Sequence, residues 1–564
     1  MSSSIQNLNK PKDAFEQLED EEGTRQGFCH IRIQQRTGRK TITTVQGIAP
    51  EYDLKKIVRY LKKTWFVPDE IFQSVEVAYY SVYGYGHLSW EWSSALRSVL
   101  HPAFIAAIFY LLRFLNLDTN YLVIILPRLL HSLIFALSDY YFYLFAKRIL
   151  LTLSAANYSL FSLLSSWFVW YCASRTLSNS LETALTLIAL NWYPVMSENA
   201  DHLVVLREWP YVSIAVLTII IRPTAVLLWI PLGLWRTLHS RSPIKLIFYT
   251  YIPAALPVIL ITCILDSFAY HKLTFSTWNF AKFNVFDGGC AHFGVHPWHW
   301  YLSQGLVSVI TIHILPIVGG IYSSIKHRSI HFIYLLVPFF YIFVHSLLAH
   351  KEHRFILPII PFLCIYSGHF LAHTLRKFAL TKRILIFLML LVNVPLAIYM
   401  GLFHQIGPNS ALKFIREHSF VHFGSQKDFS VLYLMPCYSM PEYSHFHRFN
   451  VSVISLDCTP NLKNLSSYID ESDRFHLNPL LWVNTNKQLV VSSHYLVLYE
   501  KVFMNLEEFF TQNNFHEYNC NGTTVDHPEY GEVIQLTGDQ RQHIKDFLCR
   551  VGIVKEENCK IHGF

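Results

Sequence analysis

Residues 64–98 read TWFVPDEIFQSVEVAYYSVYGYGHLSWEWSSALRS, and a long series of apolar segments begins directly after this stretch. Asp69 and Glu70 follow Pro68, a pattern typical of a helix start, where acidic residues complement the helix dipole. Two adjacent carboxylates are also the groups that a general base requires. The pattern alone leaves both interpretations open. Further polar and aromatic side chains of this stretch are candidates to line a substrate pocket, namely Gln73, Glu76, Trp90, Glu91 and Trp92.

The composition indicates a membrane protein. Of 564 residues, 52% are hydrophobic and only 15% are charged, whereas a soluble chain carries about 25% charged residues. The deficit lies between residues 100 and 404, where apolar runs recur, several of them near the ~20 residues that cross a bilayer as a helix. We therefore predict a polytopic α-helical membrane protein with roughly nine to eleven membrane segments. The net charge of +7 is modest, and we expect no nucleic-acid partner.

The chain divides into four parts by composition. Basic clusters between apolar runs mark the cytosolic side, which places the opening stretch and the C-terminal part on the luminal side. The predicted parts are a charged tail without regular structure (1–64), a luminal catalytic loop (65–99), a multi-span body (100–404) and a smaller mixed α/β luminal domain (405–564). Three glycosylation sequons agree with a luminal C-terminal part, at Asn450, Asn464 and Asn521. Five cysteines there also allow a disulfide, although their pairing cannot be read from the sequence.

The sequence HKEHRF places a charged cluster between two apolar runs, at His350, Lys351, Glu352 and Arg354. Charged residues at such a position are costly unless they stay at the interface or face a polar cavity. Arginine, lysine and histidine together suit a phosphate group. The alternative is an interfacial loop with snorkelling cations. Arg97 and Arg222 are further phosphate candidates, although a structural ion pair explains Arg222 equally well.

Other polar residues at the predicted luminal face are Arg175 and, in the sequence HPWHW, His296, Trp298 and His299. Two histidines three residues apart are a weak zinc signal, and packing around a sugar or lipid, or interfacial anchoring, explains them as well. The chain has no Walker loop, no dinucleotide fingerprint, no GxSxG and no DxD pair. We therefore expect no metal and no cofactor, and a lipid-phosphate donor rather than a nucleotide sugar.

The opening stretch, IRPTA, HPWHW and especially HKEHRF resemble the family 22 glycosyltransferases. This resemblance implies the GT-C fold, a multi-pass location in the endoplasmic reticulum membrane and dolichyl-phosphate mannose as the donor. The most specific motif of the family, HKExRF, is matched by His350, Lys351, Glu352, Arg354 and Phe355.

Three more stretches resemble the branch of this family that adds the third mannose, α1,2-linked, to the dimannosyl GPI precursor: WNFAKFNVFDGG (278–289), FGVHPWHWYLSQG (293–305) and MPCYSMPEYSHFH (435–447). The implied chemistry inverts the anomeric centre. Asp69 would be the base, with Glu70 as its partner or the alternative base. His350, Lys351 and Arg354 would hold the donor phosphate, aided by Arg97 or Arg222, and the remaining candidates, with Glu352, would bind substrate.

The chain departs from the family before residue 65. Members have a first transmembrane helix there, but residues 41–64 contain five lysines and arginines in their second half, too many to span a bilayer at reasonable cost. Either the helix is absent, or the sequence carries an alternative or incorrectly joined N-terminus. Two other functions remain open: a sibling mannosyltransferase acting on dolichol-linked oligosaccharide, and a non-catalytic polytopic membrane protein.

Overall fold

The computed structural model describes residues 29–35, 41–46, 67–195, 204–423, 428–447, 449–461, 468–513, 515, 522–527, 531–537 and 559–562. The chain forms two compact units. One consists of Thr64–Pro408 with Ile415–Asn513, and the other of Met1–Lys63, Asn409–Phe414 and Asn514–Phe564. All the candidate catalytic and substrate-binding residues belong to the larger unit.

The larger unit opens with a short helical region that carries the two acidic residues of the PDE sequence. It continues into α3 (Glu76–Tyr83), which ends where Gly84 adopts a left-handed conformation with φ of 79°, as is common at helix C-termini. The helix α4 (Trp90–Ser93) follows. The buried faces of the opening region pack against α5 (Leu100–Phe114), whose apolar residues Ile105 and Phe109 are fully buried. The opening stretch is therefore an ordered part of the protein interior.

Long apolar helices make up the body, as the composition predicts. In the described part of the chain, five segments are long and apolar enough to cross a membrane: Asn120–Leu150, Pro243–Ala269, Tyr301–His327, His353–Thr374 and Ala379–Ser419. Four shorter apolar helices accompany them within the described residues: Leu100–Phe114, Leu153–Leu164, Glu208–Ile221 and Ile333–Leu347. These segments confirm the polytopic α-helical architecture.

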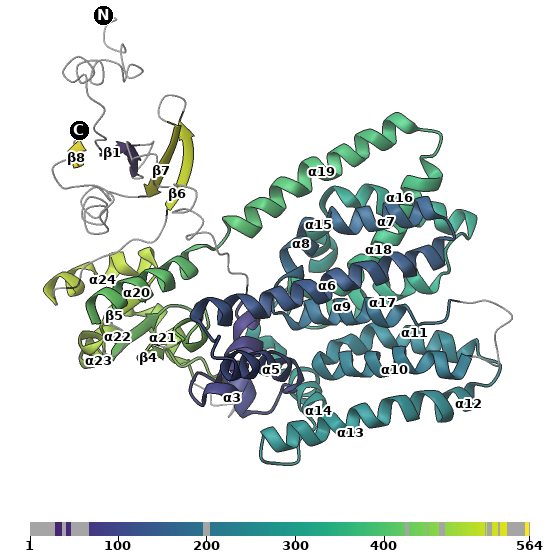
Figure 1. The fold of residues 1–564 in the computed structure, drawn as a ribbon, viewed down its shortest axis with the longest axis horizontal. Coiled ribbons are helices and arrows are strands. Elements are labelled where there is room, and N and C mark those ends of the chain that lie inside the picture. The colour runs from purple at the N-terminus through teal and green to yellow at the C-terminus, as the bar shows by residue number, and fades with distance from the viewer. Residues whose placement is uncertain are drawn as a thin grey trace, which may run out of the picture. The chain divides into compact units, whose positions relative to one another are not determined.

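The helices of the body are α6 (Asn120–Leu150), α7 (Leu153–Leu164), α8 (Trp167–Ala173), α9 (Ser178–Leu190), α10 (Val204–Ile221), α11 (Val226–Leu238), α12 (Pro243–Leu246), α13 (Ile252–Ala269), α14 (Ser276–Ala281), α15 (Leu306–Ile310), α16 (Ile314–His327), α17 (Ile333–Leu347), α18 (Ile360–His369), α19 (Ala379–Leu402) and α20 (Gly407–Phe423). Figure 1 shows α6, α9, α10 and α13 running side by side. The helix α18 is central, between α7 and α16. A side chain at Gly320 would collide with the backbone of Tyr366, and one at Gly368 with Ser159, so glycine permits this close helix packing.

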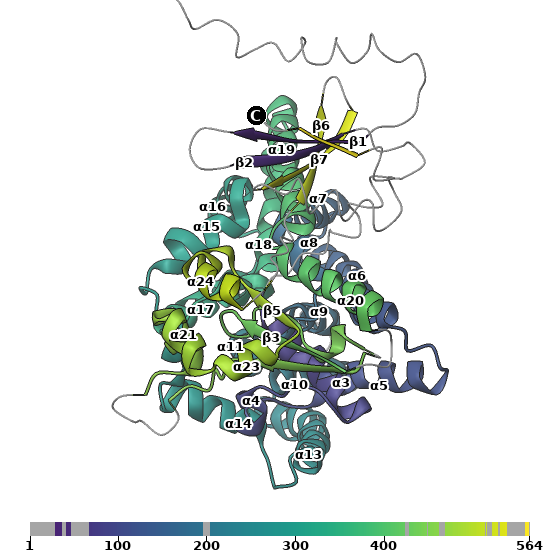
Figure 2. The same cartoon turned by 90° about the vertical axis from the view of Figure 1, so that its left-hand side faces the viewer.

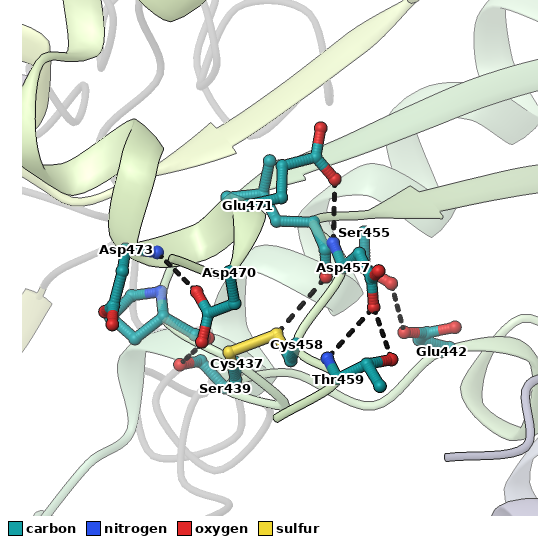
Figure 3. Close-up of a disulfide and its surroundings, with 12 residues drawn as sticks. Cys437, Ser439, Glu442, Ser455, Asp457, Cys458, Thr459, Asp470, Glu471 and Asp473 are labelled. Atoms are coloured by element: carbon teal, nitrogen blue, oxygen red, sulfur yellow. Dashed lines mark hydrogen bonds between the residues drawn. A yellow bond between two sulfur atoms is a disulfide. The ribbon is translucent and has the colours of Figure 1, made fainter. Parts of the chain in front are cut away.

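A smaller α/β region follows the body, as the sequence predicts. Its sheet has three parallel strands in the order β4-β3-β5, namely Val451–Ser455, Phe429–Leu434 and Tyr495–Leu498. Four helices accompany it, α21 (Glu471–Leu477), α22 (Pro479–Thr485), α23 (Lys487–Ser492) and α24 (Glu500–Gln512). Cys437 and Cys458 form a disulfide after the first and second strands (Figure 3), which identifies the pairing that the sequence left open.

The smaller unit contains a second sheet, with five strands in the order β6-β7-β2-β1-β8. The strands are β1 (Cys29–Gln35), β2 (Thr41–Gln46), β6 (Gly522–His527), β7 (Gly531–Thr537) and β8 (Cys559–His562). Figure 2 shows the purple N-terminal strands beside the yellow C-terminal ones. Two strands therefore lie in the segment 1–64, for which the sequence predicted a tail without regular structure.

Candidate functional site

Asp69 and Arg354 join the two most distinctive sequence motifs. Arg354 lies at the start of the segment that leads into α18, and its guanidinium contacts Asp69 Oδ2 at 2.5 Å. The same guanidinium donates to both carboxylate oxygens of Glu352, at 2.7 and 2.6 Å. The Arg354 side chain is 7% exposed and that of Asp69 is 19% exposed. The PDE and HKEHRF motifs thus form one ion-paired centre that is open at Asp69.

Glu70 has a different environment from its neighbour. Its side chain is fully buried, and its two carboxylate oxygens contact Arg128 and Arg175, both at 2.8 Å. Burial opposes ionisation, but the two arginines outweigh it and hold the pKa of Glu70 below its usual value. Glu70 is therefore ionised at neutral pH although it lies inside the protein. Arg175 was among the expected substrate-binding residues, and the structure places it in this ion pair.

A third ion pair lies in the second half of the opening stretch. Glu91 accepts a hydrogen bond from Gln73 at 3.1 Å and contacts Arg97 at 3.0 Å. Arg97 also lies over the ring of Phe280, with its guanidinium carbon 5.3 Å from the ring centroid. Trp92 is buried and donates from its ring nitrogen to the carbonyl of Phe72. These contacts fix the second half of the opening stretch against its first half.

Arg222 forms a structural ion pair in the body, one of the two outcomes that the sequence allowed. Its Nε lies 3.0 Å from the fully buried Glu182, and one terminal nitrogen donates to Ser178. Both guanidinium groups, of Arg222 and Arg354, contact the ring of Phe355, with their carbons 5.1 and 5.4 Å from its centroid. Arg222 therefore adjoins the Asp69–Arg354 centre through an aromatic ring.

The remaining residues of the HKEHRF motif point to different partners. His350 Nε2 contacts Glu352 at 2.8 Å. Burial raises the energy of a charged Glu352, but Arg354 and His350 outweigh this and bring its pKa well below the usual range. Lys351 is buried and donates to the carbonyls of His296 and Leu348. The ammonium group of Lys351 therefore connects two loops through backbone carbonyls.

Two buried nitrogens of the candidate residues have no hydrogen-bond partner in the described part of the chain, Nε of Arg97 and Nδ1 of His350. Arg97 Nε is a donor, whereas His350 Nδ1 donates only when both ring nitrogens carry a proton, because Nε2 is the nitrogen that faces Glu352. A buried donor without a partner costs about 1–3 kcal/mol. Such donors are positions at which a ligand with acceptor oxygens would be stabilised.

The aromatic candidates divide into two groups. Trp90 is buried and stacks on Phe293, with ring centroids 6.1 Å apart. His296 stacks on Trp300. Trp298, in contrast, is 68% exposed, and His299 is exposed and pairs with Ser303. The structure shows no contact that brings Trp298 or His299 into the ion-paired centre.

Glu76 connects the opening stretch to the α/β region. Its buried carboxylate accepts from the backbone nitrogens of Glu442 and Ser444 and from Ser444 Oγ, at 3.0, 3.1 and 2.7 Å. Burial raises its pKa to about 7 despite these hydrogen bonds. The pKa of Glu442 rises to about 8, mainly through burial and also through repulsion from Glu76. Glu76, expected among the substrate-binding residues, is placed at this internal connection.

Sequence reasoning did not assign roles to Arg128 or Glu182. Each is a charged residue within an otherwise apolar helix, and such a residue usually has a buried partner. Of the three sequons, Asn450 is exposed and its side chain donates to Asp428. Asn464 and Asn521 lie outside the described residues.

Comparison with protein families identifies two matches in the chain. The model of the Alg9-like mannosyltransferase family matches residues 55–447. The model of translation initiation factor SUI1 matches residues 25–68.

Similar proteins occur in animals and plants. GPI alpha-1,2-mannosyltransferase 3 of Danio rerio is 37% identical over 479 residues, which cover 81% of this chain and 82% of that protein. The Homo sapiens protein of the same name is 37% identical over 75% of this chain and 74% of its own length. Mannosyltransferase APTG1 of Arabidopsis thaliana is 35% identical over 81% and 85%.

Among solved structures, ArnT from Cupriavidus metallidurans bound to undecaprenyl phosphate resembles this chain with a TM-score of 0.51 and 12% identity, covering 85% of this chain and 95% of ArnT. At this identity the likeness concerns the fold alone. It confirms the expected GT-C fold.

Proposed function

This chain belongs to the Alg9-like mannosyltransferase family, and we propose that it transfers mannose in α1,2 linkage to a GPI-anchor precursor. The observation that carries this proposal is the match to GPI alpha-1,2-mannosyltransferase 3 proteins, 37% identical over most of both chains. The chain is a multi-pass membrane mannosyltransferase. Within this class, the acceptor, the donor and the roles of individual residues form the proposal.

The donor of this reaction is dolichyl-phosphate mannose, and the acceptor is the dimannosyl GPI precursor, which receives its third mannose in the lumen of the endoplasmic reticulum. Two features support this location and donor. The Cys437–Cys458 disulfide suits an oxidising compartment. The Asp69–Arg354 centre supplies cationic side chains beside a carboxylate, so the reaction needs neither a metal ion nor a nucleotide.

The transfer is a single displacement at the anomeric carbon. The acceptor hydroxyl oxygen forms a bond to mannose C1 while the bond from C1 to the phosphate oxygen breaks. The β-linked donor therefore gives an α-linked product. The hydroxyl proton moves to a carboxylate, and the departing dolichyl phosphate gains one negative charge. A base and cationic or hydrogen-bonding groups around the phosphate are the two requirements.

Asp69 is the base. Its side chain is 19% exposed and contacts Arg354 through Oδ2, so the carboxylate is oriented while remaining accessible to an acceptor hydroxyl. Glu70 is fully buried between two arginines, and a substrate hydroxyl cannot reach it without breaking that pairing. Arg354 orients Asp69 and connects it to Glu352.

The donor phosphate accepts a hydrogen bond from Arg97 Nε, which has no partner in the described structure, and from His350 Nδ1 when the imidazole carries both protons. Arg354 contributes its positive charge at the same centre. Lys351 acts indirectly, because its ammonium already holds two backbone carbonyls. Arg222 supports the site through Phe355.

The proposal is tested in microsomes from cells that lack GPI α1,2-mannosyltransferase activity and express this chain. The substrates are radiolabelled dolichyl-phosphate mannose and dimannosyl GPI lipid, and the product is digested with an α1,2-specific mannosidase. We expect Asp69→Asn to lower the transfer rate by about 10²–10⁴-fold, while Asp473→Asn, an exposed acid of α21, retains the wild-type rate. Extension of dolichol-linked oligosaccharide instead of the GPI lipid would assign the chain to the sibling reaction.

A further inference from the structure

The five-stranded sheet of the smaller unit combines strands from the two ends of the chain. The strand β2 pairs with β7 in antiparallel register, with Thr44 opposite Gln535. The strand β1 pairs with β8 in parallel register, with Ile31 opposite Ile561. The two N-terminal strands therefore lie inside the sheet, between β7 and β8 (Figure 2). Neither end contains the complete sheet.

The N-terminal half of this sheet has an independent family match. The SUI1 model covers residues 25–68, which include β1 and β2. About one fifth of the chain lies outside its alignment with the Danio rerio and Arabidopsis thaliana relatives. The segments 1–63 and 514–564 together make up a share of that size.

We infer that residues 1–63 and 514–564 are the two halves of one SUI1-type domain, and that the mannosyltransferase, residues 64–513, is an insertion within it. The chain therefore carries a second module whose fold belongs to a class of proteins unrelated to sugar transfer. The boundaries follow from the two long segments of the compact unit, Met1–Lys63 and Asn514–Phe564; the unit also includes the six residues Asn409–Phe414 of α20, which carry none of its strands.

The strand pairing explains why both halves are needed. The hairpin β1–β2 and the hairpin β6–β7 are each two-stranded, and an isolated two-stranded hairpin is marginally stable in water. Pairing of β2 with β7 joins them into four strands, and β8 completes five.

The two halves must lie on the same side of the membrane, because a β-ladder cannot form across a bilayer. The residues between β2 and the described start at residue 67 include a series of cations that excludes a membrane crossing: Lys55, Lys56, Arg59, Lys62 and Lys63. The N-terminal strands are therefore on the side of the opening stretch. Glu76 of that stretch contacts Ser444, and no apolar run of membrane-spanning length follows residue 428. Both ends thus share one side.

The insertion also accounts for the departure from the transferase family before residue 65. The positions at which family 22 members are expected to have a first transmembrane helix, 41–64, fall within the SUI1 match, 25–68, and only 55–64 of them also fall within the mannosyltransferase match. On this inference they belong to the SUI1-type module, which explains why they lack the composition of a membrane helix.

Disulfide trapping in the full-length protein tests this inference. Thr44→Cys and Gln535→Cys are introduced together after Cys29, Cys520, Cys549 and Cys559 are replaced by serine. Opposed residues of antiparallel strands have Cα atoms about 4.5–5.5 Å apart, within disulfide reach. The control pair is Thr44→Cys with Glu532→Cys. Glu532 lies three residues along β7 from Gln535, or about 10 Å, beyond disulfide reach. Membranes are treated with copper phenanthroline, and linked peptides are identified by mass spectrometry.

We expect at least tenfold more cross-linking in the opposed pair than in the control pair. Equal cross-linking in the two pairs would overturn the inference. A second variant, Val45→Pro, removes a donor from a strand paired on both sides. It should abolish the cross-link and leave GPI mannosyl transfer at the wild-type level. A persistent cross-link in this variant would contradict the sheet. Transfer activity is scored in the same membranes, so failure of the proposed reaction is distinguishable from failure of the split domain.

Discussion

Replacement of Glu70 by glutamine should destabilise the protein, whereas Asp69→Asn should leave its stability nearly unchanged. Glutamine matches glutamate in size, so Glu70→Gln removes a charge without creating a cavity. It leaves Arg128 and Arg175 without their carboxylate, in a place where the Glu70 side chain is fully buried. Removing one partner of a buried ion pair costs about 3–5 kcal/mol.

The cost at Asp69 is smaller for a structural reason. Its side chain is partly exposed, and Arg354 keeps its paired hydrogen bonds to Glu352 when Asp69 is neutralised. We expect about 1 kcal/mol or less, as for an exposed pair. We therefore expect Glu70 to contribute mainly to stability and Asp69 mainly to the reaction.

The assay is thermal unfolding of each purified variant in detergent, followed by tryptophan fluorescence, together with the initial rate of mannosyl transfer at a temperature where all variants are folded. Glu70→Gln should unfold several degrees below wild type, and adding Arg175→Gln should restore part of the loss by removing one uncompensated charge. Asp69→Asn should unfold near wild type and lose most of its rate. A Glu70→Gln variant with wild-type stability and a rate lowered by about 10²-fold or more would refute this reasoning and make Glu70 the base.

Three further outcomes follow from buried charges and from the disulfide. The pKa values of Glu76 and Glu442 in the folded protein are raised to about 7 and about 8. At pH values above the ordinary glutamate pKa of 4.5, the folded state therefore binds more protons than the unfolded state, and the unfolding temperature should fall from pH 5 to pH 8. A Glu442→Gln variant should show a weaker dependence of unfolding temperature on pH in the same experiment. Serine at both Cys437 and Cys458 should cost about 3 kcal/mol, since the disulfide closes a loop of 21 residues; non-reducing peptide mapping of the wild type is the control. Arg222→Gln should lower the free energy of unfolding by about 3–5 kcal/mol. In a double-mutant cycle, neutralising its partner Glu182 as well should restore part of this stability, which would show that the ion pair is structural. Purely additive losses of stability would contradict this interpretation.

The helices of the body could be predicted from sequence because a bilayer imposes one length and one polarity on any span. Apolar runs starting near residues 100 and 121 correspond to α5 and α6, which begin at Leu100 and Asn120. The strands of the α/β region were predicted for a related reason. Short apolar runs with intervening polar residues, 429–435 and 489–499, indicate strands, and they contain the observed β3 and β5.

The roles of Asp69 and Glu70 could not be separated from sequence, because they depend on partners far along the chain. Arg175, which pairs with Glu70, is 105 residues away. Arg354, which contacts Asp69, comes from the other end of the body. Although the two residues are adjacent, the Glu70 carboxylate points into the protein interior and the Asp69 carboxylate lies at a partly exposed site. The strands at 29–46 escaped prediction for the same reason, since β2 finds its second neighbour only at β7.

Glu352 determines how an anionic donor can bind. In the substrate-free protein it neutralises Arg354 through two hydrogen bonds and also contacts His350. A phosphate that displaced Glu352 from Arg354 would leave a carboxylate unpaired in a largely buried place, at a cost comparable to the gain. A phosphate that instead binds Arg97 Nε uses a donor that has no partner in the described structure, which removes the free-energy cost of that unpaired donor. His350 Nδ1 adds a second hydrogen bond when the imidazole carries both protons. Binding by the second route keeps Arg354 on Asp69, and the base remains oriented while the leaving group is held. The HKExRF motif therefore needs its glutamate as much as its cations, because the glutamate fixes the arginine that positions the base.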